Sequence, residues 1–293
     1  VWYHAPSFRP SSVGISSDGT LVVHGESVYL NLHRGGFYAY NLRIGGQDNP
    51  KRVLTTTPQF SFRVPDNVYA FRIQVGTGAG DNSKWDSQQT VATEKEVTVT
   101  YAGSSLSPHT TYWWRVRLQR FDNSWGDFWS LDKSFEIVSL DNFAGYRELT
   151  ISGDVSENQQ VKVIVDYIVG MNDNFKDLLF YDNNNPTIGL PYWVENYIVR
   201  DNAVVWVKLF DMGKTIGMYF GNNSVKNASS GDDTFLLFDD FSEGFDSVKW
   251  SAYPTTPTVS NGILQLENRY IWTKDDFGEN VVLMARKNVK STE

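Results

Sequence analysis

The sequence predicts an all-β protein built from tandem antiparallel β-sandwich domains. Apolar and polar residues alternate with a period of two through many short segments, which is the pattern of half-buried strands. Turn residues such as Gly, Pro and Asn separate these segments, as in sandwich folds. Aromatic residues make up 15% of the chain, and aromatic side chains pack well across the strands of a sheet.

The composition removes several classes of function. A net charge of −8 with scattered Lys and Arg argues against nucleic-acid binding, which needs a clustered basic surface. The absence of Cys excludes disulfides, thiol chemistry and Cys-based zinc sites. No apolar run approaches the roughly 18 residues that span a bilayer. The chain starts at Val1 and has no signal-peptide pattern, so we expect a processed protein or a piece of a longer one.

Residues 1–52 are expected to form an N-terminal β segment. One predicted strand covers residues 28–32, and in a second Tyr38, Tyr40, Leu42 and Ile44 share one face. Because the segment is short for an independent sandwich, we expect it either to complete an upstream domain or to pack on the next one.

Residues 53–138 predict a complete sandwich. In the segment 110–118, Tyr112, Trp114, Val116 and Leu118 point to one face, and Trp113, Arg115 and Arg117 point to the other. Leu106-Ser-Pro108 followed by Thr111-Tyr112 resembles the tyrosine corner of fibronectin type III domains. The motifs PQFSF, KWDSQ, TTYWWRVRL and DNSWGDFWS add to this resemblance, which is to the fibronectin type III-like modules of large extracellular proteins.

The outward residues of that segment are candidates for a binding stripe. Aromatic faces stack on the C–H surfaces of sugars, so Trp113 and Trp125 are our candidate glycan contacts. The alternatives are a cross-strand ladder with no ligand and a contact with a neighbouring domain.

A short linker, residues 139–145, predicts a stiff connection to a further β domain at residues 144–233. Within that domain we expect residues 204–210 to be a central strand, and Ile216, Met218 and Phe220 to face the core. The blocks GMNDNFKDLLFYD, LPYWVENY, VWVKL and TIGMYFGNNS resemble a domain family of unknown function found in archaeal and bacterial surface proteins. That family has no established catalytic residues, so the resemblance implies none here.

Residues 235–293 resemble the start of the concanavalin A-like lectin or glucanase domain that usually follows that family. FLLFDDFSEGFDSVKW fits its entry strand and VSNGILQLEN its next strand. The resemblance implies a partial jelly roll, which we expect to be completed by more of this chain or by other chains, since raw sheet edges pair. The paired carboxylates that glycosidases of this fold carry on one strand are absent from the sequence, so we expect no enzyme activity.

Two kinds of minor site remain. Clustered carboxylate and amide oxygens select hard cations, so calcium is the one candidate cofactor, at Asp173 and Asp177 or at Asp239 and Asp240. Asp and Asn also dominate turns with no metal, because they bond their own backbone. Asn222 and Asn227 begin N-glycosylation sequons in a polar segment that we expect to be exposed.

These observations predict a structural or adhesive component of an extracellular assembly, on a cell or virion surface. Surface filaments, adhesins and viral attachment fibres fit, with surface glycans, cell-envelope proteins or neighbouring subunits as partners. The alternative is a non-catalytic portion of an extracellular glycan-processing enzyme. Alternating carboxylates on a strand beyond Glu293 would favour the enzyme.

Overall fold

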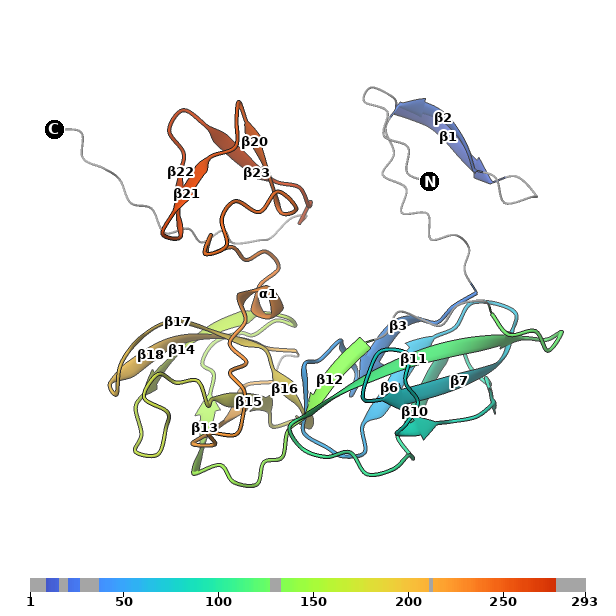
Figure 1. The fold of residues 1–293 in the computed structure, drawn as a ribbon, viewed down its shortest axis with the longest axis horizontal. Coiled ribbons are helices and arrows are strands. Elements are labelled where there is room, and N and C mark those ends of the chain that lie inside the picture. Colours follow the sequence, from blue (N-terminus) through green and yellow to red (C-terminus); the bar gives the residue numbers. More distant parts are fainter. Residues whose placement is uncertain (1–8, 16–20, 27–36, 127–132, 211–212, 278–293) are drawn as a thin grey trace.

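The protein is all-β, as the sequence predicts, and two of its sandwiches share one sheet (Figure 1). The computed structural model describes residues 9–15, 21–26, 37–126, 133–210 and 213–277. The predicted strand at residues 28–32 lies outside these ranges. An N-terminal strand pair, β1 (Arg9–Ile15) and β2 (Leu21–Glu26), is antiparallel.

The first sandwich packs a four-stranded sheet on one half of a ten-stranded sheet. The four-stranded sheet has the order β10 (Glu96–Thr100), β6 (Gln59–Arg63), β3 (Tyr40–Ile44), β4 (Gln47–Asp48). The ten-stranded sheet, called the long sheet below, has the order β13 (Gly145–Thr150), β19 (Thr215–Phe220), β15 (Leu179–Asp182), β16 (Asn185–Leu190), β5 (Arg52–Val53), β12 (Lys133–Ile137), β11 (Thr110–Arg120), β7 (Val68–Gly76), β8 (Trp85–Asp86), with β9 (Thr90–Val91) also on β7.

The core of the first sandwich follows the predicted alternation. Its members include Phe60 and Phe62 of β6, and Tyr112 and Trp114 of β11, which are all at most 1% exposed. The backbone N–H of Ser107 donates a 2.8 Å hydrogen bond to the Tyr112 hydroxyl, which confirms the predicted tyrosine corner.

The predicted side-chain orientation is wrong for the first residues of the segment 38–44. Leu42 and Ile44 are buried, but Tyr40 is 44% exposed. The register of β3 against β6 shifts between Tyr40 and Arg43, where Asn41 has a φ of +51°. This bulge adds a residue and reverses the side chains before it, so that Ala39 is buried in place of Tyr40. Strands β3 and β4 lie before residue 53 and belong to the sheet of the first sandwich.

The second sandwich packs a three-stranded sheet on the other half of the long sheet (Figure 1). The order is β14 (Gln160–Asp166), β18 (Asn202–Lys208), β17 (Tyr192–Ile198). The central place of β18 confirms the predicted central strand, although the strand begins and ends two residues before the predicted bounds of 204–210. Ile216, Met218 and Phe220 of β19 face this second core, also as predicted.

The two sandwiches meet at the two-residue strand β5. Val53 pairs in parallel with Ile137 of β12 and antiparallel with Ile188 of β16. The Leu54 N–H donates to the Thr187 carbonyl at 2.7 Å, and the Val138 N–H donates to the Val53 carbonyl at 2.9 Å. Although Ile188 lies on β16, it packs in the core of the first sandwich. The sandwiches are therefore joined through backbone pairing and side-chain packing, in addition to the linker.

The C-terminal part begins at α1 (Gly231–Thr234), capped by Ser230, which accepts the Asp233 N–H at 3.2 Å. Two small strand pairs follow: β20 (Trp250–Tyr253) with β23 (Tyr270–Thr273), and β21 (Thr258–Ser260) with β22 (Ile263–Gln265). The ring of Phe238 packs on Trp193 of the second sandwich, with centroids 4.7 Å apart. In the described ranges, no helix has the length and apolar character needed to cross a membrane.

Candidate functional site

The outer face of the first sandwich carries the strongest candidate site. We call it the Arg–Trp face and define it by residues that alternate with the core residues of β7 and β11, plus two neighbours: Arg72, Gln74, Asp86, Trp113, Arg115, Arg117 and Trp125. Cross-strand pairing places Trp113 opposite Gly76, Arg115 opposite Gln74, and Arg117 opposite Arg72. The predicted outward stripe of β11 is thus part of a wider polar and aromatic surface.

Hydrogen bonds hold the middle of this face in one arrangement. The Arg115 guanidinium donates to the Gln74 side-chain oxygen at 2.8 and 3.1 Å, and to the Gly80 carbonyl at 2.8 Å. The Gln74 amide donates to Asp86 at 3.0 Å, and Arg72 Nε donates to the same carboxylate at 2.6 Å. Such a network fixes side chains that would otherwise lose entropy on binding a ligand.

Asp86 is the acid at the centre of this network. Burial alone would raise the pKa of Asp86, but hydrogen bonds from Arg72, Gln74, Asn82 and the Gln88 backbone outweigh it and hold the pKa well below the ordinary 3.8. The carboxylate is therefore ionised at neutral pH and serves as an acceptor that orients its neighbours. It is not poised for proton transfer.

The two predicted tryptophans lie at opposite ends of the face. Trp113 is half-buried and lies beside Gly76. The loop after β7 folds back over Gly76, so that a Cβ added to this glycine would lie 2.5 Å from the Asp81 side chain. The Trp125 ring lies under the Arg117 guanidinium, whose Cζ is 5.9 Å from the ring centroid, and Arg117 Nε donates to the Gly126 carbonyl at 2.9 Å. Trp113 and Arg117 are four residues apart on β11, about 13 Å along an extended strand. The structure supplies an aromatic group at each end of a polar stripe.

Sequence reasoning missed Arg72, Gln74 and Asp86. Arg72 and Gln74 alternate with the core residues Phe71, Ile73 and Val75, so the period of two already marked them as outward. Predicting that Arg72 and Gln74 pair with residues of β11 requires the strand order of the sheet, and the sequence pattern does not give that order.

The loop predicted to bind calcium uses its carboxylates in other ways. Asp173 forms an ion pair with Arg200, with 2.7 Å between its Oδ1 and Nε, and the hydrogen bond from Arg200 lowers the Asp173 pKa. Asp177 is 1% exposed, and its Oδ2 accepts the N–H groups of Asn172 at 2.9 Å and Gly221 at 2.6 Å. Asp177 therefore ties the loop to the end of β19.

The second predicted calcium pair lies at the entrance to the C-terminal part. Asp239 accepts the Phe241 N–H at 2.8 Å and the Trp250 indole N–H at 2.8 Å. Asp240 accepts the Ser242 N–H at 3.0 Å, and this hydrogen bond lowers the Asp240 pKa. Within the described ranges, no three His, Cys, Asp or Glu side chains gather as a metal site would require. Calcium binding stays a prediction.

The expected exposure of the two sequons is wrong for Asn222. Asn222 is 4% exposed, since its Oδ1 accepts the Ser224 N–H at 3.0 Å in a turn packed after β19. A glycan on Nδ2 would require this side chain to leave the turn. Asn227 is exposed, and its Oδ1 accepts the Ser229 N–H at 3.1 Å. Glycosylation at Asn227 stays a prediction.

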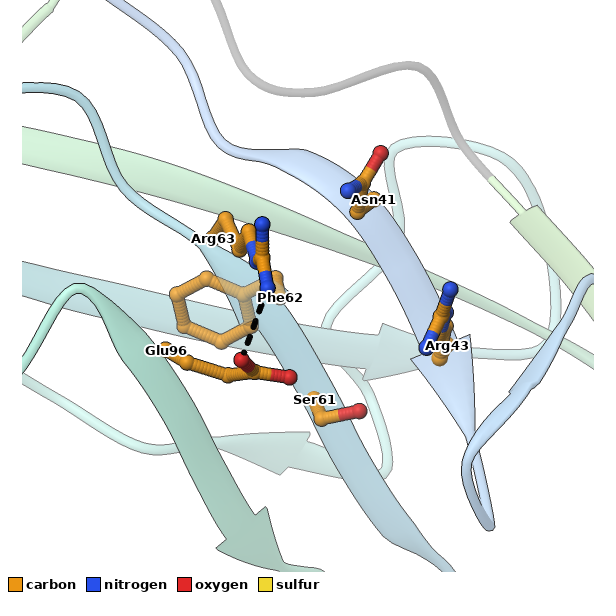
Figure 2. A pocket seen from close by; sticks show the side chains of 6 residues that line it. All are labelled: Asn41, Arg43, Ser61, Phe62, Arg63 and Glu96. Atoms are coloured by element: carbon orange, nitrogen blue, oxygen red, sulfur yellow. Dashed lines mark hydrogen bonds and ion pairs between the residues drawn. The ribbon is translucent and has the colours of Figure 1, made fainter.

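Two hollows lie on the described surface outside the Arg–Trp face. Figure 2 shows one of about 120 Å³ on the outer side of the four-stranded sheet, where Arg63 and Glu96 form an exposed ion pair of 3.1 Å. Sites for drug-sized ligands commonly have volumes of about 300 to 1,000 Å³. A second hollow, of about 330 Å³, lies beside residues 54–56 and 137–141 at the junction. The first hollow therefore falls below this range, and the second lies at its lower end.

Two family models match separate parts of the chain. Residues 39–141 match the family model described as the Rha78A-like, N-terminal immunoglobulin domain. Residues 174–253 match the model described as Domain of unknown function (DUF2341). Neither match supports the predicted archaeal or bacterial origin or the concanavalin relationship, which stay predictions.

Solved structures show only distant similarity, and no curated protein matches the chain. An α-L-rhamnosidase from Dictyoglumus thermophilum is 16% identical over 63% of this chain and 25% of its own, with a TM-score of 0.33. One from Streptomyces avermitilis is 16% identical over 69% of this chain and 26% of its own, with a TM-score of 0.32. The chain therefore spans about a quarter of the length of these enzymes.

A three-domain fragment of chicken CNTN1 is 10% identical over 73% of this chain and 72% of its own, with a TM-score of 0.29. At these scores the likenesses say nothing about activity. The family matches and the described fold together show that the chain combines an immunoglobulin-like or fibronectin-like module with a domain of unknown function.

Proposed function

We propose that this chain is a non-catalytic, rigid scaffold of an extracellular protein, which holds the parts on either side of it in a fixed relative orientation. The observation that carries this proposal is the continuous pairing of β12, β5 and β16 across the junction. Hinged domains are joined by few contacts, whereas a shared sheet resists both bending and twisting.

Side-chain contacts at the junction support the same role. The Asn185 amide donates to the Gly45 carbonyl at 3.1 Å, and a Cβ added to Gly45 would lie 2.7 Å from Ile188 Cγ1. Arg52 is 6% exposed and donates a hydrogen bond to the Lys226 carbonyl. Residues from both sandwiches thus contact each other beside β5, which supports a fixed connection and not a hinge.

A distance measurement between the sandwiches tests this rigidity. Because the chain has no Cys, the pair Thr98→Cys and Lys162→Cys on exposed strand positions can carry two spin labels with no other thiol present. We expect one narrow distance distribution by electron–electron dipolar spectroscopy. The matched variant Leu54→Pro, which removes the 2.7 Å bond to Thr187, should broaden it. A broad distribution before that substitution would overturn the proposal.

The Arg–Trp face supports a second function, adhesion through a surface glycan. Its observation is a hydrogen-bonded row of guanidinium, amide and carboxylate groups between two indole rings. Trp113→Ala and Trp125→Ala should each weaken retention on an immobilised glycan panel, whereas Trp272→Ala, at a 52% exposed Trp of β23, should not. Equal retention of all three variants would refute glycan binding by this face.

An accessory position in a glycan-processing enzyme is compatible with both roles. The match of residues 39–141 to an N-terminal immunoglobulin domain fits a module that precedes other domains in a longer protein. Sequencing the gene beyond Glu293 separates this context from a filament or fibre.

A further inference from the structure

The second sandwich carries a cluster of tyrosines on the outer face of the long sheet. Tyr146 of β13 pairs directly with Tyr219 of β19, and Tyr181 of β15 pairs with Gly217 of β19. Their strand neighbours Phe180 and Met218 face the core, so the tyrosines point away from it. We call Tyr146, Tyr181 and Tyr219 the tyrosine platform.

The three rings form one nearly continuous aromatic surface. Tyr146 and Tyr219 have centroids 5.1 Å apart, Tyr181 and Tyr219 are 5.5 Å apart, and Tyr146 and Tyr181 are 6.3 Å apart. The angles between ring planes are 44°, 23° and 28° respectively, so the rings lie closer to parallel than to edge-on. Tyr181 is 9% exposed and Tyr219 is half-buried, so Tyr146 is the most accessible ring of the three.

Gly217 makes this arrangement possible. A Cβ added there would lie 2.3 Å from the Tyr181 ring, which means that the ring rests directly on the β19 backbone. At that position any side chain would lift Tyr181 out of the platform. The platform is therefore a built feature of the sheet and not three independent surface residues.

Polar groups border the platform on one side and an apolar cluster borders it on the other. Glu148 lies two residues from Tyr146 on the same face of β13 and opposite Gly217, and it accepts the Asn183 amide at 2.9 Å. Phe143 packs on Tyr219 with centroids 5.3 Å apart, within a cluster that includes Val138, Leu179 and Val225. Tyr146 is 37% exposed, so a ligand has access to its ring.

The Tyr181 hydroxyl of the platform is protonated at neutral pH. Burial, followed by hydrogen bonding and electrostatic coupling with Tyr146 and Tyr219, raises the pKa of Tyr181 above its usual 10.0. The Tyr181 hydroxyl can therefore both donate and accept a hydrogen bond at neutral pH.

We propose that the tyrosine platform, with Glu148 and Asn183 at its rim, is a binding site for a neutral saccharide. Ring faces carry negative electrostatic potential and attract the polarised C–H groups of a sugar, while hydroxyl, amide and carboxylate groups meet the sugar hydroxyls. Glu148 disfavours uronic and sialic acids, since like charges repel. The site is independent of the scaffold role and of the Arg–Trp face.

Affinity electrophoresis of the whole chain through gels with soluble polysaccharides tests this site. The probes are a β-glucan, a xylan and a mannan as neutral polymers, and polygalacturonate as an anionic one. We expect retardation by at least one neutral polymer and none by polygalacturonate. Tyr146→Ala should raise the dissociation constant about tenfold, as loss of an aromatic anchor commonly does. Tyr197→Ala, at a 45% exposed Tyr on β17 of the opposite sheet, is the matched control and should leave it unchanged.

Two further variants keep the test valid if Tyr146→Ala disturbs folding. Tyr146→Phe keeps the ring, and Glu148→Ala changes only the rim; each should weaken binding less than Tyr146→Ala while preserving the melting temperature. Retardation that is equal in the unsubstituted protein and in all platform variants would overturn the proposal. The absence of retardation by every neutral polymer would also overturn the proposal. A Tyr146→Ala variant that loses self-association but is retarded as strongly as the unsubstituted protein would overturn it as well. Trp113→Ala, tested in the same gels, separates this site from the Arg–Trp face.

Discussion

Replacing Ile188 by Ala tests whether the two sandwiches are thermodynamically coupled. Ile188 is 1% exposed and belongs by position to β16, yet it packs in the core of the first sandwich. The transfer free energy alone is about 0.8 kcal/mol for each methylene removed, and Ile→Ala in a core costs about 2 to 5 kcal/mol once the cavity is included. We expect a loss near 3 kcal/mol, or about 6 to 12 °C in melting temperature for a unit of about 190 residues.

Differential scanning calorimetry separates a loss of stability from a loss of coupling. The unsubstituted protein should show one transition for both sandwiches, because β5 and β16 share a sheet. Ile188→Ala should lower that transition and split it in two. Ile216→Ala is the matched control: it is also 1% exposed, lies in the core of the second sandwich, and should lower the transition without splitting it. Two transitions in the unsubstituted protein would refute the coupling, and an unchanged melting temperature in Ile188→Ala would refute the packing.

Three further predictions concern individual polar residues. The pKa of Asp86 is lower in the folded chain than the ordinary value, so its stabilisation is present above about pH 4 and is lost as the pH falls below that. The free energy of unfolding should therefore fall further between neutral and acid pH for the unsubstituted protein than for Asp86→Asn, and an equal fall in both would contradict this role of Asp86. Asp177→Ala strands two buried N–H donors and should cost about 2 to 5 kcal/mol in urea unfolding, against less than about 0.5 kcal/mol for the exposed Asp166→Ala. If the protein is glycosylated, peptide mapping should find the glycan on Asn227 and not on the buried Asn222, and the reverse distribution would contradict the packing of that turn.

Strand positions and core faces could be predicted because they depend on local patterning. The alternation of Tyr112, Trp114, Val116 and Leu118 is unbroken, and all four side chains reach the core. The same reasoning failed at Tyr40, where one extra residue at Asn41 reverses the side chains and leaves no mark in the hydrophobic pattern. A period of two is reliable only while the register is constant.

The junction could not be predicted, because its central strand has only two residues, Arg52 and Val53. So short a segment has no period, and its partners in β12 and β16 lie far along the chain. The sequence does predict a stiff connection from the brevity of residues 139–145. The structure adds a second cause of stiffness, the shared sheet, which depends on contacts between distant segments.

The candidate sites show the same division between local and distant information. The indole groups of Trp113 and Trp125 were identifiable as side chains suited to sugars. The carboxylates of Asp173 and Asp177 were predicted to bind calcium because their actual hydrogen-bond and ion-pair partners could not be seen in the sequence. Asp173 pairs with Arg200 and Asp177 with the Gly221 N–H, and neither contact has a sequence signal. The tyrosine platform did have one, since Tyr219 alternates with Met218 and Phe220. What was missing was the register that brings Tyr146, Tyr181 and Tyr219 together.

The long sheet also determines the direction in which each of the two candidate binding surfaces points. Ile188 and Leu190 lie on the same face of β16, and Ile188 packs in the first core while Leu190 packs in the second. Both cores therefore lie on one face of the long sheet, and the Arg–Trp face and the tyrosine platform lie on the other.

Four strand-to-strand steps separate β11 from β15, through β12, β5 and β16. At about 4.8 Å and about 20 to 25° for each step, the two surfaces are roughly 19 Å apart and rotated by about 80 to 100°. A straight ligand lying flat on one surface would point away from the other. If the junction is as rigid as we propose and both surfaces bind glycans, this angle is fixed, and the two surfaces should then hold separate ligands or separate segments of one bent chain.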